Sequence, residues 1–189
     1  MNNHQHPLVL TAFVLLALVQ TGVPLSMIAR REATLKNGQV LKFKTAPVDP
    51  YDAFRGRYVA LRIEDTFPTP KGREFSRNQT VYVTFAEDSD GFAVISDVES
   101  RRPQAGRYIR ARLRYWGGDN VHIRFPFDRY YMNEKMAPEA ERAYQDHSRR
   151  GKLDAYITVR VSGGFAVLEE LYVADKPIVE FISEDESNE

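Results

Sequence analysis

The chain has 189 residues, and its 26 Lys and Arg residues balance its 26 Asp and Glu residues. This neutral net charge argues against nucleic acid as a partner, since proteins that bind nucleic acid present an excess of basic residues. The sequence contains no cysteine, which excludes a disulfide framework, a thiol nucleophile and a thiolate metal site. Once an apolar N-terminal segment is set aside, about 160 residues remain, a length typical of a single globular domain.

The apolar N-terminal segment predicts a membrane span. Residues 1–6 form a short tail, and residues 7–29 contain no charged side chain. As a helix, this segment would be about 34 Å long, enough to cross a hydrocarbon core about 30 Å thick. The tail lacks Lys and Arg, and the run Met27-Ile28-Ala29 places a bulky residue where a signal-peptide cleavage site needs a small one. We therefore predict an uncleaved signal anchor, a single-pass helix whose partner is the lipid bilayer.

The soluble domain, residues 30–182, is predicted to be mainly β. Apolar and polar residues alternate between turns rich in Gly, Asn and Asp, the pattern of strands with one buried face. The pattern predicts strands over 40–44, 58–64, 80–87, 92–98, 106–116, 121–125, 154–162 and 165–174, with an edge strand over 177–182. Such a set of strands fits a β-sandwich or a partly open barrel.

One surface helix near residues 138–150 interrupts the strands. Pro138 suits the first helical position, Glu139 suits the positive end of the helix dipole, and Arg149 suits its negative end. The acidic tail, residues 183–189, is predicted to be disordered. The fold class is thus mainly β with one surface helix, preceded by an N-terminal transmembrane helix.

The segment TAPVDPYDAFRGRYVALRIE, residues 45–64, combines backbone restriction with polar side chains. Asp49 is predicted to cap a short turn that begins at Pro50, with Asp52 reaching back toward its free N–H groups. The structural motif comprises Pro47, Asp49, Pro50, Asp52, Gly56, Tyr58 and Leu61. The alternative interpretation makes Asp49 and Asp52 an acid–base pair or a metal site, although a hard cation needs more oxygens than one turn supplies.

This segment resembles the signature of the GDYXXLXY protein family, a group of membrane-anchored bacterial proteins. Gly56, Tyr58 and Leu61 match the motif, whereas Arg57 and Ile63 stand where the family has Asp and the final Tyr. The resemblance continues in FDRYYMNE (127–134) and ITVRVSGGFAVLEELYV (157–173). It implies a single membrane anchor followed by an extracytoplasmic domain, and it brings no established activity or catalytic residue.

The orientation in the membrane has two interpretations. Arg30 and Arg31 directly follow the apolar segment, and the positive-inside rule would leave the domain on the cytoplasmic side. The family resemblance implies the opposite, a domain on the outer side of the bacterial inner membrane.

The strand GRYIRARLRYW carries a row of arginines. Alternation places Arg110, Arg112 and Arg114 on one face, flanked by aromatic residues. Such a face could bind an anionic lipid or an anionic polymer. The alternative is a solvated face paired across the sheet with carboxylates such as Glu87 or Glu99.

Further binding candidates lie in two of the three segments that resemble the family. Asp128 and Arg129, in FDRYYMNE, could line a pocket beside residues 45–64, or belong to a linker that docks aromatic residues before the helix. Arg55, Arg57 and Tyr58 are the other binding candidates, because the two arginines have no structural role in the capped turn.

We predict a membrane-anchored, non-catalytic binding or accessory module of the bacterial envelope. Its partner would be another membrane protein, an anionic lipid or an envelope polymer. The sequence has no HExxH, Ser/His/Asp or P-loop signature, so no metal or cofactor is predicted. The alternative is a membrane-anchored hydrolase or acid–base enzyme that uses Asp49, Asp52 and Asp128 in a shared cleft.

Overall fold

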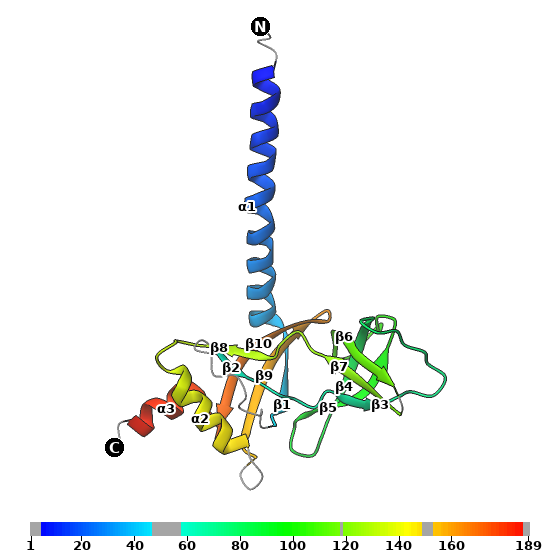
Figure 1. Cartoon of the computed structure of the whole chain (residues 1–189), viewed down its shortest axis with the longest axis vertical. Coiled ribbons are helices and arrows are strands. Elements are labelled where there is room, and N and C mark those ends of the chain that lie inside the picture. Colours follow the sequence, from blue (N-terminus) through cyan, green and yellow to red (C-terminus); the bar gives the residue numbers. More distant parts are fainter. Residues whose placement is uncertain (1–4, 47–57, 118, 149–152, 187–189) are drawn as a thin grey trace.

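A long helix stands off from a β-rich body in the computed structural model (Figure 1). The structure describes residues 5–46, 58–117, 119–148 and 153–186. Most of the regular structure beyond the helix is strand, arranged in three sheets. The predicted class, mainly β after an N-terminal apolar helix, is therefore confirmed.

The N-terminal helix α1 (Gln5–Asn37) changes character along its length. Its apolar part contacts no other element: the most apolar window, within residues 9–37, has none of its residues buried. Its last turns instead pack on strands of the body. Thr34 is buried there, and Arg30 lies over the ring of Phe165 with its guanidinium carbon 4.4 Å from the ring centre.

Gly38 makes the junction between α1 and the body close-packed. Its N–H donates to the carbonyl of Thr34 at 2.8 Å, which ends the helix. A Cβ at this position would lie 2.4 Å from that carbonyl oxygen and 3.1 Å from the backbone N of Val161. Only glycine fits such an approach, and the first strand begins at the next residue, so no free linker separates helix and body.

The first sheet is antiparallel and has the order β1-β9-β10-β11. Its strands are β1 (Gln39–Lys44), β9 (Ala155–Ser162), β10 (Phe165–Val173) and β11 (Lys176–Pro177). β10 has an irregularity in its pairing with β9 between Leu168 and Glu170.

The second sheet has five antiparallel strands in the order β3-β7-β6-β4-β5. These are β3 (Thr66–Pro68), β4 (Thr80–Glu87), β5 (Ala93–Glu99), β6 (Tyr108–Gly117) and β7 (Asn120–Arg124). One face is apolar because Val81, Val83, Ile109, Leu113 and Ile123 all point inward and are buried.

The two sheets share one aromatic core. Phe43 of β1 packs edge-to-face on Phe85 of β4, with ring centres 5.2 Å apart. Phe125 and Phe127, which follow β7, are stacked at 5.6 Å and both contact Phe43. Each such pair adds about 0.5–1.5 kcal/mol beyond simple burial, so these four rings hold the sheets together.

A second link between the sheets is the tip of the β9–β10 hairpin. The N–H of Arg110 in β6 donates to the carbonyl of Gly164 at 2.9 Å. Gly164 has a φ of +83°, and a Cβ there would lie 2.7 Å from the ring of Tyr108. Glycine therefore allows the hairpin tip to lie directly on the start of β6.

A two-stranded sheet of β2 (Tyr58–Ala60) and β8 (Arg129–Tyr131) lies beside the first sheet (Figure 1). The strand predicted over 58–64 is thus shorter than expected. Beyond Ala60 the chain keeps its alternation, with Leu61 and Ile63 buried. It leaves β2 to cross toward the second sheet, where it forms β3.

The C-terminal helices complete the body and correct one prediction. α2 (Ala137–Ser148) occupies the expected place, with Tyr144 buried and its hydroxyl donating to the carbonyl of Ala46 at 2.9 Å. The edge strand predicted over 177–182 is wrong, because α3 spans Ile178–Glu186. Its buried residues, Ile178 and Ile182, are four apart and lie on one helical face. The helix includes residues 183–186 of the tail predicted to be disordered, and residues 187–189 lie outside the described part.

Candidate functional site

The pairing of β2 with β8 brings together two segments that are far apart in sequence. Tyr58 lies opposite Tyr131, and Ala60 lies opposite Arg129. The rings of Tyr58 and Tyr131 are 5.7 Å apart, and the guanidinium of Arg129 lies 4.7 Å from the centre of the Tyr58 ring. Tyr58, Arg129 and Asp128, all candidates from the sequence, are therefore neighbours.

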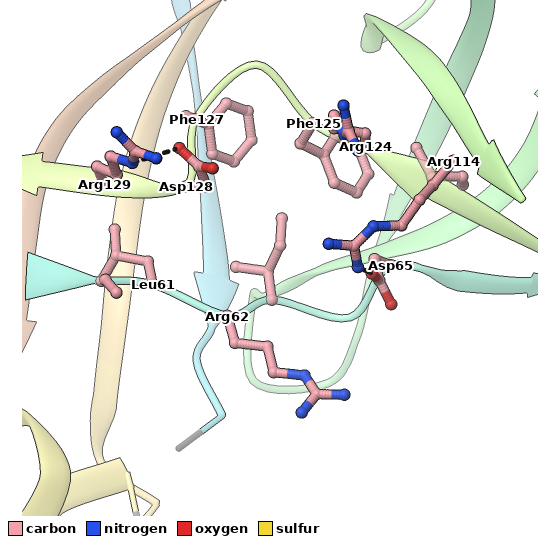
Figure 2. A pocket seen from close by; sticks show the side chains of 12 residues that line it. Leu61, Arg62, Asp65, Arg114, Arg124, Phe125, Phe127, Asp128 and Arg129 are labelled. Atoms are coloured by element: carbon pink, nitrogen blue, oxygen red, sulfur yellow. Dashed lines mark ion pairs between the residues drawn. The ribbon is translucent and has the colours of Figure 1, made fainter. Parts of the chain in front are cut away.

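Next to this pair, an open groove of about 490 Å³ runs between residues 60–65 and residues 123–129 (Figure 2). Backbone hydrogen bonds hold its two sides together. The N–H of Leu61 donates to the carbonyl of Asp128 at 2.9 Å, and the N–H of Ile123 donates to that of Asp65 at 2.7 Å. We call this feature the basic groove. Its floor contains Phe125 and Phe127 of the shared core, and its charged lining residues are Arg62, Asp65, Arg114, Arg124, Asp128 and Arg129.

Arginines outnumber carboxylates in the basic groove, four to two. Arg114 lies 3.9 Å from Asp65, and Arg129 lies 3.7 Å from Asp128. Both ion pairs are solvent-exposed, and such pairs contribute at most about 1 kcal/mol. Within the described ranges, no carboxylate is within 4 Å of Arg62 or Arg124. Among the described residues, the groove therefore has an excess of positive charge beside the apolar rings of Phe125 and Phe127.

The arginines of β6 lie on the outer face of the five-stranded sheet, as the alternation predicts. Arg110, Arg112 and Arg114 are all exposed. The expected carboxylate partners are not there: Glu87 pairs with Arg107, and the register places Glu99 opposite Tyr82. Arg107 holds the pKa of the Glu87 carboxyl below its usual value. Only Arg114 of the three reaches a described carboxylate, that of Asp65.

The residues of the acid–base alternative are not brought together by any described contact. Asp49 and Asp52 lie outside the described residues, as do Arg55, Arg57, Pro47, Pro50 and Gly56. Asp128 has a side chain that is 75% exposed and is near Arg129. Among the residues that the structure describes, no group of three His, Asp or Glu side chains could hold a metal ion.

Arg62 and Arg124 line the groove and were not site candidates from the sequence. Arg30, which the sequence raised only for membrane orientation, lines a neighbouring cavity together with Arg124. Arg62 carries a detectable signal, since it alternates with buried Leu61 and Ile63 and must face outward. Arg124 carries the same signal, since it lies between buried Ile123 and Phe125. Its position opposite Arg112 carries none, because that depends on the pairing irregularity between β6 and β7.

A comparison with protein families covers most of the described body. The sequence model of the GDYXXLXY protein family matches residues 20–171, from the middle of α1 to β10. The chain belongs to the GDYXXLXY protein family. The match confirms the resemblance that the sequence carries in residues 56–63, 127–134 and 157–173. No curated protein and no solved structure matches this GDYXXLXY protein.

Proposed function

We propose that this GDYXXLXY protein is a membrane-anchored, non-catalytic binding module of the bacterial envelope. Helix α1 would cross the inner membrane, and the β-rich body would bind an anionic group of another membrane protein or of an envelope polymer in the basic groove. The observation that carries the proposal is the excess of arginine in that groove. Arg62 and Arg124 line the groove together with Phe125 and Phe127, and neither arginine has a carboxylate within 4 Å among the described residues.

Anchoring is supported by the length and surface of α1. The helix has 33 residues, and the large apolar side chains along it, from Val9 to Ile28, are exposed. Exposed apolar surface of this extent is costly in water and favourable in lipid. We propose that the body is extracytoplasmic, as expected for the family, although Arg30 and Arg31 oppose this side by the positive-inside rule.

The groove is tested with purified full-length protein in a neutral detergent. The probes are fluorescent polyglutamate and polyphosphate, and binding is followed by anisotropy at two salt concentrations. The double variant Arg62→Gln/Arg129→Gln should bind at least tenfold more weakly than the natural chain, since charge-assisted hydrogen bonds are lost. Arg142→Gln, on the exposed side of α2, serves as the control. Equal binding by the natural chain and the double variant would overturn the proposal for the groove.

Anchoring and orientation are tested separately. Extraction of membranes with alkaline carbonate should leave the protein in the pellet if α1 spans the bilayer. A C-terminal reporter that is active only outside the cytoplasm should be active; a reporter active only inside would place the body on the cytoplasmic side instead.

A further inference from the structure

A second cavity lies where α1, the β9–β10 hairpin tip and the outer face of the five-stranded sheet meet. It has a volume of about 440 Å³ and is lined by four arginines: Arg30 from α1, Arg110 and Arg112 from β6, and Arg124 from β7. No acidic residue of the described part of the chain lines it. We call it the arginine pocket.

The arginine pocket places like charges next to one another. Arg112 and Arg124 are directly opposite residues of neighbouring antiparallel strands, where side chains are about 5 Å apart and like charges destabilise the sheet. Neither of them, nor Arg110, has an ion pair with a carboxylate in the described ranges. A surface that gathers unpaired cations in a concave site is unfavourable unless an anion occupies it.

The position of the pocket along the chain indicates which anion is available. Arg30 is the first charged residue after the apolar segment 7–29, so its backbone lies where a membrane span ends. From there the helix runs without interruption into the body, where Gly38 and Thr34 fix it on the sheet. The contact of Arg30 with Phe165 places the hairpin tip at the same end of α1 (Figure 1). The pocket is thereby held at the level of the lipid head groups, a layer several ångströms thick outside the hydrocarbon core.

We propose that the arginine pocket binds the phosphate of an anionic phospholipid from the bilayer that α1 crosses. Guanidinium groups suit this ligand because they bind phosphate oxygens with paired, charge-assisted hydrogen bonds. Arg112 and Arg124 would hold the phosphate between the two strands, and Arg30 would approach it from the helix. The bound lipid would fix the tilt of the body against the membrane and hold the basic groove in one orientation. This inference rests on the proposed membrane anchoring and is independent of the ligand of the basic groove.

The test uses the full chain in detergent and native mass spectrometry. The protein is titrated with phosphatidylglycerol, with phosphatidylcholine as the zwitterionic comparison. The natural chain should retain phosphatidylglycerol in preference to phosphatidylcholine. The variant Arg110→Gln/Arg112→Gln should retain it at least tenfold less well, and Arg142→Gln should behave like the natural chain. Arg110→Lys/Arg112→Lys keeps the charge and should recover only part of the affinity, because Lys lacks the paired donors.

Equal retention of the two lipids by the natural chain, or unchanged retention by the Gln variant, would overturn the inference. Inorganic phosphate is added as a competitor, because the phosphate group that the pocket binds could belong to a lipid head group or to soluble phosphate. Full displacement of the lipid by phosphate at matched concentration would assign the pocket to soluble phosphate and would also overturn the lipid assignment.

The lipid test of the arginine pocket can fail independently of the polyanion test of the basic groove. The two sites share only Arg124 among the arginines that line them. Arg62 and Arg129 line the basic groove alone, and Arg110 and Arg112 line the arginine pocket alone. Loss of polyanion binding in Arg62→Gln/Arg129→Gln and loss of lipid binding in Arg110→Gln/Arg112→Gln would therefore be separate results. Release of the protein by carbonate would show that the anchoring itself fails.

Discussion

The hydroxyl of Tyr130 in β8 donates a hydrogen bond to Oε1 of Glu170 in β10, with 2.5 Å between the oxygens. The same carboxylate oxygen accepts the N–H of Leu171 at 2.9 Å. Burial, and then the Glu170 carboxylate, raise the pKa of Tyr130, so its hydroxyl remains a donor at alkaline pH values at which an exposed tyrosine ionises. This contact ties the small β2–β8 sheet to the first sheet and joins two of the three segments that carry the family resemblance.

Replacing Tyr130 with Phe should lower the free energy of unfolding by about 1–2 kcal/mol. A hydrogen bond to a charged acceptor is lost, and among the described residues the partly buried Glu170 carboxylate keeps only the N–H of Leu171 as a donor. Thermal unfolding of the full chain in detergent measures the effect. Tyr131→Phe is the matched control, because Tyr131 is 68% exposed and its change should stay within about 0.5 kcal/mol. Equal stability of the two variants would show that the Tyr130–Glu170 contact contributes nothing.

Replacing Arg112 with Thr should raise the stability of the ligand-free protein by about 0.2–1 kcal/mol. The change removes the like-charge pair with Arg124 and places a good strand former opposite Thr80. Arg110→Thr is the control, since Arg110 lies opposite Tyr82 and should show no comparable gain. Denaturant unfolding without added lipid measures both variants. A loss of stability in Arg112→Thr would mean that Arg112 has a favourable partner rather than a repulsive one.

Stability should fall at alkaline pH because of Tyr156. Burial, and then the nearby Asp175 carboxylate, raise the pKa of Tyr156 from 10.0 to about 12. Both states are protonated below pH 10, so the contribution is fully present there. Between pH 10 and 12 the unfolded state ionises first and the contribution is progressively lost.

The melting temperature of the natural chain and of Tyr156→Phe, measured between pH 8 and 12, checks this expectation. The difference between the two should change over pH 10–12, whereas other groups affect both proteins alike. Parallel curves would contradict the raised pKa of Tyr156.

Replacing Gly38 with Ala should destabilise the junction of α1 with the body by about 1–3 kcal/mol. The new methyl group would lie 2.4 Å from the Thr34 carbonyl oxygen and 3.1 Å from the Val161 backbone N, and backbone atoms cannot move aside easily. Gly22→Ala is the matched control, because nothing lies within 4 Å of a Cβ there. Thermal unfolding in detergent compares the two. A Gly38→Ala variant as stable as Gly22→Ala would indicate that the junction is loose.

Much of the fold is predictable because it depends on local patterns. Alternation predicts the burial of Val81, Val83 and Phe85 in β4, and the composition of residues 7–29 predicts the apolar part of α1. The prediction for the C-terminal segment is wrong because residues 177–182 are too few to distinguish the period of a strand from that of a helix. Ile178 and Ile182 fit either a strand face or a helix face, and packing against α2 and β10 decides for the helix.

The sites depend on contacts that no local pattern contains. In the sequence, Tyr58 and Arg129 are two candidates in separate segments, and only the β2–β8 pairing makes them neighbours. Likewise, Arg30 belongs to the end of a hydrophobic helix and Arg110 to a strand. The approach of Gly164 to β6 and of Phe165 to Arg30 brings both to one cavity.

By itself, the sequence determined the family, the apolar N-terminal helix, the mainly β class and the outward row of Arg110, Arg112 and Arg114. The tertiary structure decided which arginines cluster. A regular hairpin with Gly117 opposite Asn120 would place Arg124 opposite Leu113 and away from Arg112. The irregularity in β6, between Leu113 and Tyr115, shifts the register by one residue, so Leu113 meets Ile123 and Arg112 meets Arg124. Because side chains alternate with a period of two, this single shift matches the buried face of β6 to that of β7 and places the outward-facing Arg112 and Arg124 side by side in the arginine pocket.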